Sequence, residues 1–131
     1  NGALYLFIQD SIEWLDHAKG AIANFHIVFM IQLSFHLGFM PNIESGMSGD
    51  YFDLVDGCFA AHVPSHVHYL NKEDSMRLVS LFRLDYKTMH LYTMSRIERN
   101  RCVEVILEYY KLHLPDFPEM KSFSVLQELF A

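Results

Sequence analysis

The chain has 131 residues, of which 51% are hydrophobic and 20% are charged. This content suits one domain with a real core and excludes an intrinsically disordered chain. The formal net charge of −6 argues against a protein that coats nucleic acid, since such proteins are usually basic overall. Two cysteines are too few for a disulfide scaffold, so we expect a reduced, cytoplasmic compartment. No apolar stretch is long enough to predict a membrane span.

The first two predicted elements are helices. Residues 3–17 carry apolar side chains at helical spacing, which predicts a stripe that faces the core. The stripe consists of Leu4, Phe7, Ile8, Ile12 and Leu15, widened by Trp14. Residues 21–37 are apolar on nearly all sides, which is typical of a central helix. Gly38 is expected to follow the end of that helix, and Pro41 prevents its continuation.

Residues 42–68 differ in character, because glycine, serine, aspartate and asparagine are frequent there. Two short apolar runs, 51–54 and 58–60, flank the dipeptide Asp56-Gly57. This pattern predicts a β-hairpin insertion with Asp56-Gly57 as its turn.

The second half of the chain is predicted to be helical again. Asn71 is placed to cap a third helix, whose predicted apolar face consists of Met76, Leu78, Val79 and Phe82. Residues 84–94 suggest a short turn or helix. Ser95 and Glu98 have the spacing of a capping box, which begins a helix over residues 96–114.

A last helix is predicted to begin at Ser122 or Ser124. The expected fold is therefore mainly α: a compact helical bundle with one small β-hairpin insertion. Because the chain begins with Asn1 rather than methionine and enters a helix at once, we expect it to be part of a longer protein.

Charge is distributed unevenly along the chain. Residues 1–70 hold seven acids and the single cation Lys19, whereas residues 77–101 hold six cations and only two acids. The six cations are Arg77, Arg83, Lys87, Arg96, Arg99 and Arg101. Arg96 and Arg99 lie one turn apart at a predicted helix start, where a cation is unfavourable and an anion is favoured. The pattern indicates a site for an acidic partner, and the alternative is ordinary solvated helix faces.

The histidines and cysteines offer one candidate metal site. Cys58, His62, His66 and His68 lie beside the predicted hairpin, and their thiolate and imidazole groups suit zinc. The spacing lacks the Cys-x2-Cys pair of many structural zinc sites, so a polar loop with exposed histidines is the alternative. His26 and His36 lie in the apolar second helix and are expected to be hydrogen-bonded core histidines.

Motifs of nucleophilic or metal-dependent enzymes are missing from the sequence, as are phosphate-binding glycine loops. We therefore expect a binding protein without a cofactor rather than an enzyme. A small zinc-binding or enzymatic helical domain built on the four candidate ligands remains the alternative.

Several short motifs follow one another along nearly the whole chain. They are NFHIVF at 24–29, LGFMPN at 37–42, YFDL at 51–54, GCF at 57–59, MHL at 89–91, SRIERNR at 95–101, YYKLHL at 109–114 and KSFSVL at 121–126. In order and spacing they resemble the C-terminal region of RecO, the bacterial recombination mediator, in its Bacteroides-like form.

This resemblance implies that residues 1–131 form one helical domain behind an N-terminal OB-fold that this chain lacks. It also implies a non-enzymatic DNA-repair protein that binds DNA, RecR and single-stranded-DNA-binding protein, helps to load RecA and anneals strands. The family's helical domain is associated with the acidic, hydrophobic C-terminal tail of single-stranded-DNA-binding protein. On this hypothesis the six cations rim an apolar groove that receives the tail. DNA binding by the same cations is a second hypothesis.

In one respect the chain departs from the resemblance. Many RecO proteins carry a four-cysteine zinc finger after the 37–42 motif. Here the first cysteine pair is missing from residues 44–49, and the second would fall near Ala61 and Pro64, offset from Cys58. The finger is therefore expected to be degenerate, with the hairpin held by packing through Tyr51, Phe52, Leu54 and Phe59.

Overall fold

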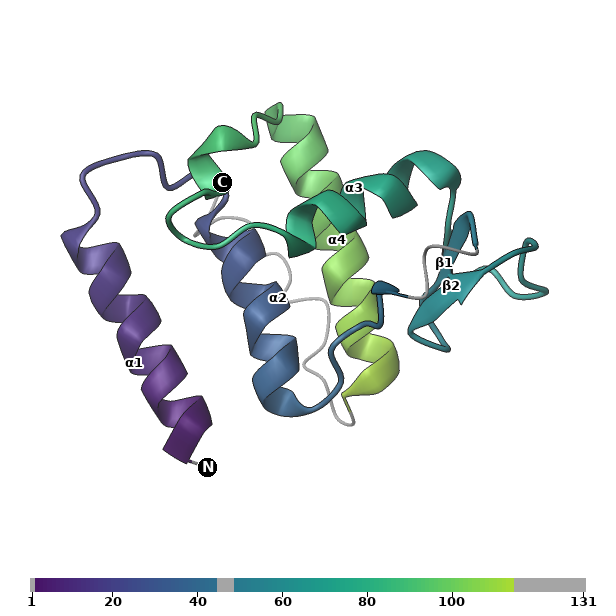
Figure 1. The fold of residues 1–131 in the computed structure, drawn as a ribbon, viewed down its shortest axis with the longest axis horizontal. Coiled ribbons are helices and arrows are strands. Elements are labelled where there is room, and N and C mark those ends of the chain that lie inside the picture. Colours follow the sequence, from purple (N-terminus) through teal and green to yellow (C-terminus); the bar gives the residue numbers. More distant parts are fainter. Residues whose placement is uncertain (1, 45–48, 115–131) are drawn as a thin grey trace.

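Four α-helices and one small antiparallel sheet form the part of the chain that the computed structural model describes, residues 2–44 and 49–114 (Figure 1). The helices are α1 (Gly2–His17), α2 (Phe25–Leu37), α3 (Lys72–Phe82) and α4 (Arg96–His113), with a short 3-10 helix, η2 (Met89–Leu91). The strands are β1 (Tyr51–Asp53), β2 (Cys58–Ala60) and β3 (Tyr69–Leu70). The prediction of a mainly helical domain with a small β insertion is confirmed. The helix predicted from Ser122 or Ser124 lies outside the described residues.

Helix α4 lies at the centre of the molecule, because both larger core clusters include its side chains. One cluster joins Ile27 and Ile31 of α2 to Ile106 and Tyr110 of α4. The other joins the sheet to α3 and α4, with Phe52 completely buried at its centre. Helix α1 lies at one edge of the bundle beside α2, and the sheet lies at the opposite end (Figure 1). Among the described residues, no helix combines the length and apolarity that a membrane span needs.

The hairpin is present as predicted, and a third strand extends the sheet. The strand order is β2-β1-β3, with Phe52 paired to Phe59 on one side and to Leu70 on the other. Gly57 has a φ of 68° in the turn, a left-handed conformation that glycine adopts without strain. The buried hydroxyl of Ser75 in α3 accepts from the Phe52 N–H at 3.0 Å and donates to the Leu70 carbonyl at 3.2 Å. This hydroxyl ties α3 to the sheet.

The predicted helix caps are present. Ser95 and Glu98 form a reciprocal capping box, with distances of 2.8 Å from Ser95 N to Glu98 Oε1 and 3.1 Å from Glu98 N to Ser95 Oγ. The Asn71 side chain accepts from the Asp74 N–H at 2.8 Å and begins α3. Gly38 ends α2 with a φ of 91°.

Two predicted features of the first half were wrong. Helix α2 begins at Phe25 rather than at residue 21, because Ala21 has a φ of 58°, outside the helical region. Before the helix, Asn24 Nδ2 donates to the carbonyls of Met89 at 2.9 Å and Tyr92 at 2.8 Å. In α1 the predicted core stripe is only partly covered, with Ile8 36% and Ile12 55% exposed.

The predicted apolar face of α3 also needs a correction. Met76 is 65% exposed, because the side of α3 that packs against α4 and the sheet is formed by Leu78 and Leu81. The last predicted residue of the final described helix, Leu114, is its C-terminal cap.

Candidate functional site

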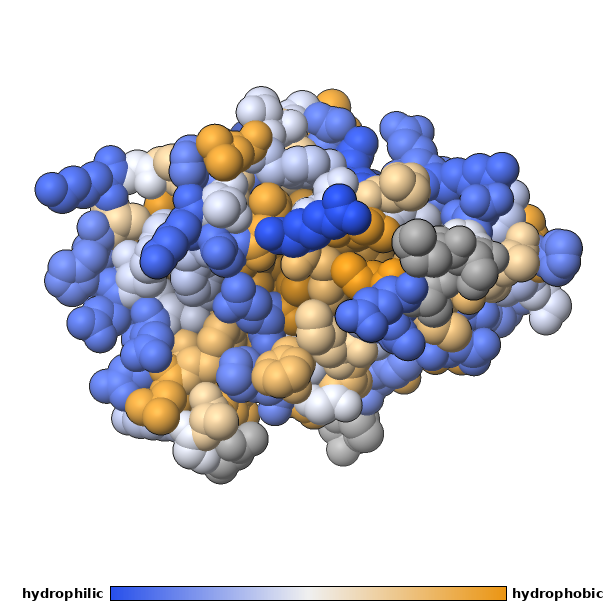
Figure 2. Space-filling model, in the orientation of Figure 1, coloured by the Kyte–Doolittle hydropathy of each residue, from blue (hydrophilic) through white to orange (hydrophobic). Residues whose placement is uncertain are grey.

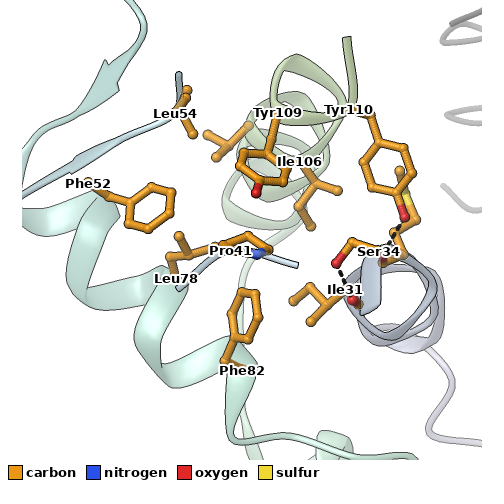
Figure 3. Close-up of a pocket in the computed structure, with 12 residues that line it drawn as sticks. Ile31, Ser34, Pro41, Phe52, Leu54, Leu78, Phe82, Ile106, Tyr109 and Tyr110 are labelled. Atoms are coloured by element: carbon orange, nitrogen blue, oxygen red, sulfur yellow. Dashed lines mark hydrogen bonds between the residues drawn. The ribbon is translucent and has the colours of Figure 1, made fainter. Parts of the chain in front are cut away.

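A small apolar pocket of about 20 Å³, enough for little more than a water molecule, lies between α2, α3, α4 and β1 (Figure 3). It is lined by Met30, Ile31, Ser34, Pro41, Phe52, Leu54, Leu78, Phe82, Val105, Ile106, Tyr109 and Tyr110. Figure 3 shows Pro41 in the middle, between the side chains of α3 and those of α4. Hydrophobic residues also gather on the surface over α2 and α3, bordered by hydrophilic ones (Figure 2).

The hydroxyl groups of the lining are already engaged. Ser34 Oγ donates to the Ile31 carbonyl at 2.6 Å, and the Tyr109 and Tyr110 hydroxyls donate to the carbonyls of Phe39 and Met30. None of the described residues that line the pocket is charged. A charged group at this pocket would lose its hydration without gaining a partner from the described lining.

Two of the six predicted cations form ion pairs within the fold. Arg77 Nη2 lies 3.1 Å from Glu98 Oε2 and 3.8 Å from Glu73 Oε1. Arg101 Nη2 lies 3.1 Å from Asp74 Oδ2, and its Nη1 lies 3.6 Å from Glu104 Oε2. The Arg77–Glu98 and Arg101–Asp74 pairs join α3 to α4, and four acids surround the two arginines. The groove between α3 and α4 is therefore not basic, although both arginines line it.

We expect Arg77→Ala to lower the free energy of unfolding by about 1 kcal/mol, because Arg77 is mostly buried and joins two helices. Arg96→Ala is the matched control and should change stability by less than about 0.5 kcal/mol. Urea denaturation followed by circular dichroism measures both values. Equal stability of the two variants would contradict a structural role for the Arg77 pair.

Arg99 is partly committed to the fold as well. Its Nη1 donates to the Met94 carbonyl at 2.8 Å, in the turn before α4. Burial, and secondarily the charge of Arg99, lowers the pKa of His26 from its ordinary value of 6.5 to about 4. His26 is 7% exposed, which confirms the prediction of a core histidine. His36 is only partly buried and stacks on Phe7, with 4.5 Å between ring centroids.

The remaining three cations, Arg83, Lys87 and Arg96, are exposed. Within residues 2–44 and 49–114, no ion pair involves any of them. The nearby Asp85 carboxylate accepts from Thr88 and from the Lys87 N–H, and these bonds, first of all that from the Thr88 N–H, lower the pKa of Asp85. Arg83 directly follows Phe82, which lines the pocket. Lys87 lies in the segment after α3, and Arg96 is the first residue of α4.

The structure does not gather the four candidate zinc ligands. His62 is exposed, and His66 Nε2 lies 3.1 Å from the Asp53 carboxylate, whereas His68 Nδ1 lies 3.0 Å from Glu108 Oε1. Among the described residues, no three histidine, cysteine, aspartate or glutamate side chains are placed to hold a metal ion. Cys58 is a half-buried free cysteine of β2.

The structural roles of His66 and His68 were not predicted from the sequence. His66 and His68 attach the loop between β2 and β3 to β1 and α4, each through a carboxylate. The Nδ1 atom of His66 also accepts the His68 N–H at 3.0 Å, which leaves Nε2 to donate to Asp53. Packing of Phe52 against Phe59, with centroids 5.2 Å apart, holds the hairpin as expected.

Comparisons with known proteins agree on one family. The family model described as "Recombination protein O C terminal" matches residues 1–122. The DNA repair protein RecO of Phocaeicola vulgatus is 47% identical over 131 residues, which cover 100% of this chain and 54% of that protein. RecO of Bacteroides fragilis is 48% identical over 99% of this chain and 54% of its own length, and RecO of Porphyromonas gingivalis W83 is 34% identical over 97% and 53%.

The chain thus spans about half the length of the curated relatives that it matches. No solved structure matches it significantly. The relatives cover all of the motifs that carried the resemblance to RecO, and the family model covers all of them except most of the last, at 121–126. This chain therefore belongs to the family of recombination protein O C-terminal regions.

Proposed function

We propose that this chain is a protein-binding module of DNA repair that holds the acidic, apolar C-terminal tail of single-stranded-DNA-binding protein. The observations that support the proposal are the apolar pocket and the exposed cations Arg83, Lys87 and Arg96, for which the described residues show no ion pair. Family membership supports a role in DNA repair. The module acts in the cytoplasm through binding rather than catalysis.

Each half of such a tail has a counterpart in the fold. An apolar side chain at the end of the tail packs against the opening of the pocket, where the described lining residues carry no charge and their hydroxyls already form hydrogen bonds. The carboxylates of the tail face Arg83, at the C-terminal end of α3, and the two other exposed cations. Exposed charges of this kind steer and orient an acidic partner, whereas burial of the apolar side chain supplies most of the affinity.

Three of the six predicted cations already have partners within the fold. Arg77 and Arg101 already pair with acids, and Arg99 already donates to a carbonyl. Breaking these contacts would offset part of any gain from a new carboxylate. We therefore assign the main contact with the tail to Arg83 and Arg96, with Lys87 and Arg99 in support.

Titration of a fluorescently labelled tail peptide, read by anisotropy, tests the proposal. Arg83→Ala and Arg96→Ala should each weaken binding about three- to tenfold, the range for one exposed charge contact. Lys19→Ala removes an exposed cation that follows α1 and serves as the matched control. Unchanged affinity in both arginine variants would remove them from the site.

Changes in the peptide test the pocket without altering the protein. A peptide whose apolar residues are replaced by serine should lose most of its affinity. A peptide whose carboxylates are replaced by amides should lose the salt-dependent part of binding. Full affinity of the serine peptide would exclude the apolar pocket as the binding site.

Three further partners are proposed for the full-length protein rather than for this region alone. We propose that it also contacts RecR and DNA, and that it helps to load RecA and to anneal strands. DNA could use the same exposed cations, and an oligonucleotide that displaces the tail peptide would show that the two sites overlap. The apolar pocket favours the peptide over DNA as the partner, because DNA phosphates gain no electrostatic contact from an uncharged lining.

A further inference from the structure

The small sheet lies at the opposite end of the molecule from α1 (Figure 1), and its outer face has no part in the proposed function. The inner face, with Phe52 at its centre, packs against α3 and α4. Since successive side chains of a strand point to opposite sides, the neighbours of Phe52 belong to the outer face. Strand pairing extends this face across the sheet, and its members are Tyr51, Asp53, Cys58, Ala60 and Tyr69. The solvent face of an antiparallel sheet is usually polar, whereas here Asp53 is the one charged member.

Two tyrosines form the aromatic part of the outer face. The rings of Tyr51 and Tyr69 meet edge to face with 6.1 Å between centroids, and both residues are half-buried. Lys72, the first residue of α3, places its Nζ 6.0 Å from the centroid of the Tyr51 ring and 3.6 Å from Asp50 Oδ2. An aromatic face and a carboxylate both attract a cation, so the structure shows where a positive charge is received on this face.

Lys72 is held weakly in this position. Its side chain is 65% exposed and that of Asp50 is 63% exposed, and an exposed ion pair of this kind contributes little to stability. A cation from another molecule can therefore replace Lys72. Arginine suits the two groups better than lysine does, because its planar guanidinium stacks on an aromatic ring and binds a carboxylate through two nitrogens.

The charge of this part of the chain favours a basic partner. No lysine or arginine occurs from residue 20 to residue 71, a stretch that holds the four acids Glu44, Asp50, Asp53 and Asp56. The bases of single-stranded nucleic acid also stack on aromatic side chains, but their phosphates would be repelled by these acids. Complementary charge therefore favours a protein segment that carries arginine over a nucleic acid.

We propose that the outer face of the sheet is a docking surface for an arginine-bearing segment of a partner protein. The guanidinium of the segment lies on the tyrosines and pairs with Asp50, in the place that Lys72 holds in the free chain. This partner is basic, whereas the tail proposed for the apolar pocket is acidic, so the two proposals stand or fall separately.

The test titrates the ¹⁵N-labelled chain with the peptide Arg-Gly-Arg-Gly-Arg and follows the NMR shifts of the sheet amides. Tyr69→Ser and Asp50→Asn should each weaken binding about three- to fivefold, because each removes one contact of the guanidinium. Lys72→Gln should strengthen binding about two- to fivefold, because it removes the competing cation. Lys19→Gln makes the same change in net charge elsewhere and should leave binding unchanged, as should Tyr5→Ser at a tyrosine of α1 that is 68% exposed.

The gain expected for Lys72→Gln cannot come from a folding defect, so this variant decides the test even if Tyr69→Ser does not fold. Equal affinity of Lys72→Gln and the wild type would show that Lys72 does not hold the place of the guanidinium. An equal gain for Lys19→Gln would reduce the effect to net charge. Tighter binding of an oligothymidylate that Tyr69→Ser weakens would assign the face to nucleic acid. Concentration-dependent dimerisation that Asp50→Asn abolishes would assign it to a second copy. Each of these four results overturns the proposal.

Discussion

Replacement of Phe52 by alanine is expected to lower the free energy of unfolding by about 3–5 kcal/mol, the range for emptying a fully buried aromatic site. Phe52 has no exposed surface, and its ring packs against those of Phe59 at 5.2 Å and Tyr109 at 6.5 Å. It is the central side chain of the contact between the sheet, α3 and α4. A loss of this size is a large part of the stability of a typical domain.

Urea denaturation measures this loss, and Phe52→Leu keeps the test usable if the alanine variant does not fold. The leucine variant keeps most of the buried volume and should lose about 1–2 kcal/mol. Val67→Ala removes apolar atoms from an exposed position and should change stability by less than about 0.5 kcal/mol. A loss below about 1 kcal/mol for Phe52→Ala would contradict its place at the centre of this core.

The sequence predicts most of the helices because their signals are local. The Ser95 capping box, the Asn71 cap and the glycine after α2 depend on residues close in sequence, and each is present in the structure. The start of α2 could not be predicted in this way. The segment before α2 is held by bonds from Asn24 to carbonyls 65 and 68 residues away, and no local sequence pattern predicts these bonds.

Burial on single helix faces was harder to predict. Periodicity indicated that Ile8, Ile12 and Met76 belong to an apolar face, but it does not say whether another element covers that face. Strand β3 was missed because two residues carry no periodic pattern. Its pairing is explained instead by Ser75 of α3, which bonds to both neighbouring strands.

The candidate site was predictable only in part. The six cations are visible as a local excess of charge, but their pairing depends on how α3 and α4 align. Asp74 and Glu98 each lie beside an arginine of the other helix, which removes Arg77 and Arg101 from the free set. An apolar groove was predicted, but the residues that line the pocket were not, because they come from three helices and from the segments in and around β1. Charge can be read from a sequence, whereas its neutralisation needs the fold.

The buried histidine of α2 should make stability depend on pH. Burial, assisted by Arg99, lowers the pKa of His26 from 6.5 to about 4. In the unfolded chain this imidazole takes up a proton as the pH falls through 6.5, whereas in the folded chain it stays neutral down to about 4. The unfolded state therefore binds more protons between these values, so the stability present above pH 6.5 falls as the solution is acidified.

His26→Gln should remove this dependence, because glutamine is polar and does not titrate. Between pH 6 and 5, wild-type stability should fall by about 1.4 kcal/mol per pH unit more than that of the variant, and the total should reach about 2–3 kcal/mol near pH 4. Urea denaturation at a series of pH values measures the two slopes, and His62→Gln, an exposed histidine, is the matched control. The slope is diagnostic even if glutamine lowers stability at every pH, since a packing defect is independent of protonation. Parallel curves for wild type and His26→Gln would show that His26 is not held neutral by the fold.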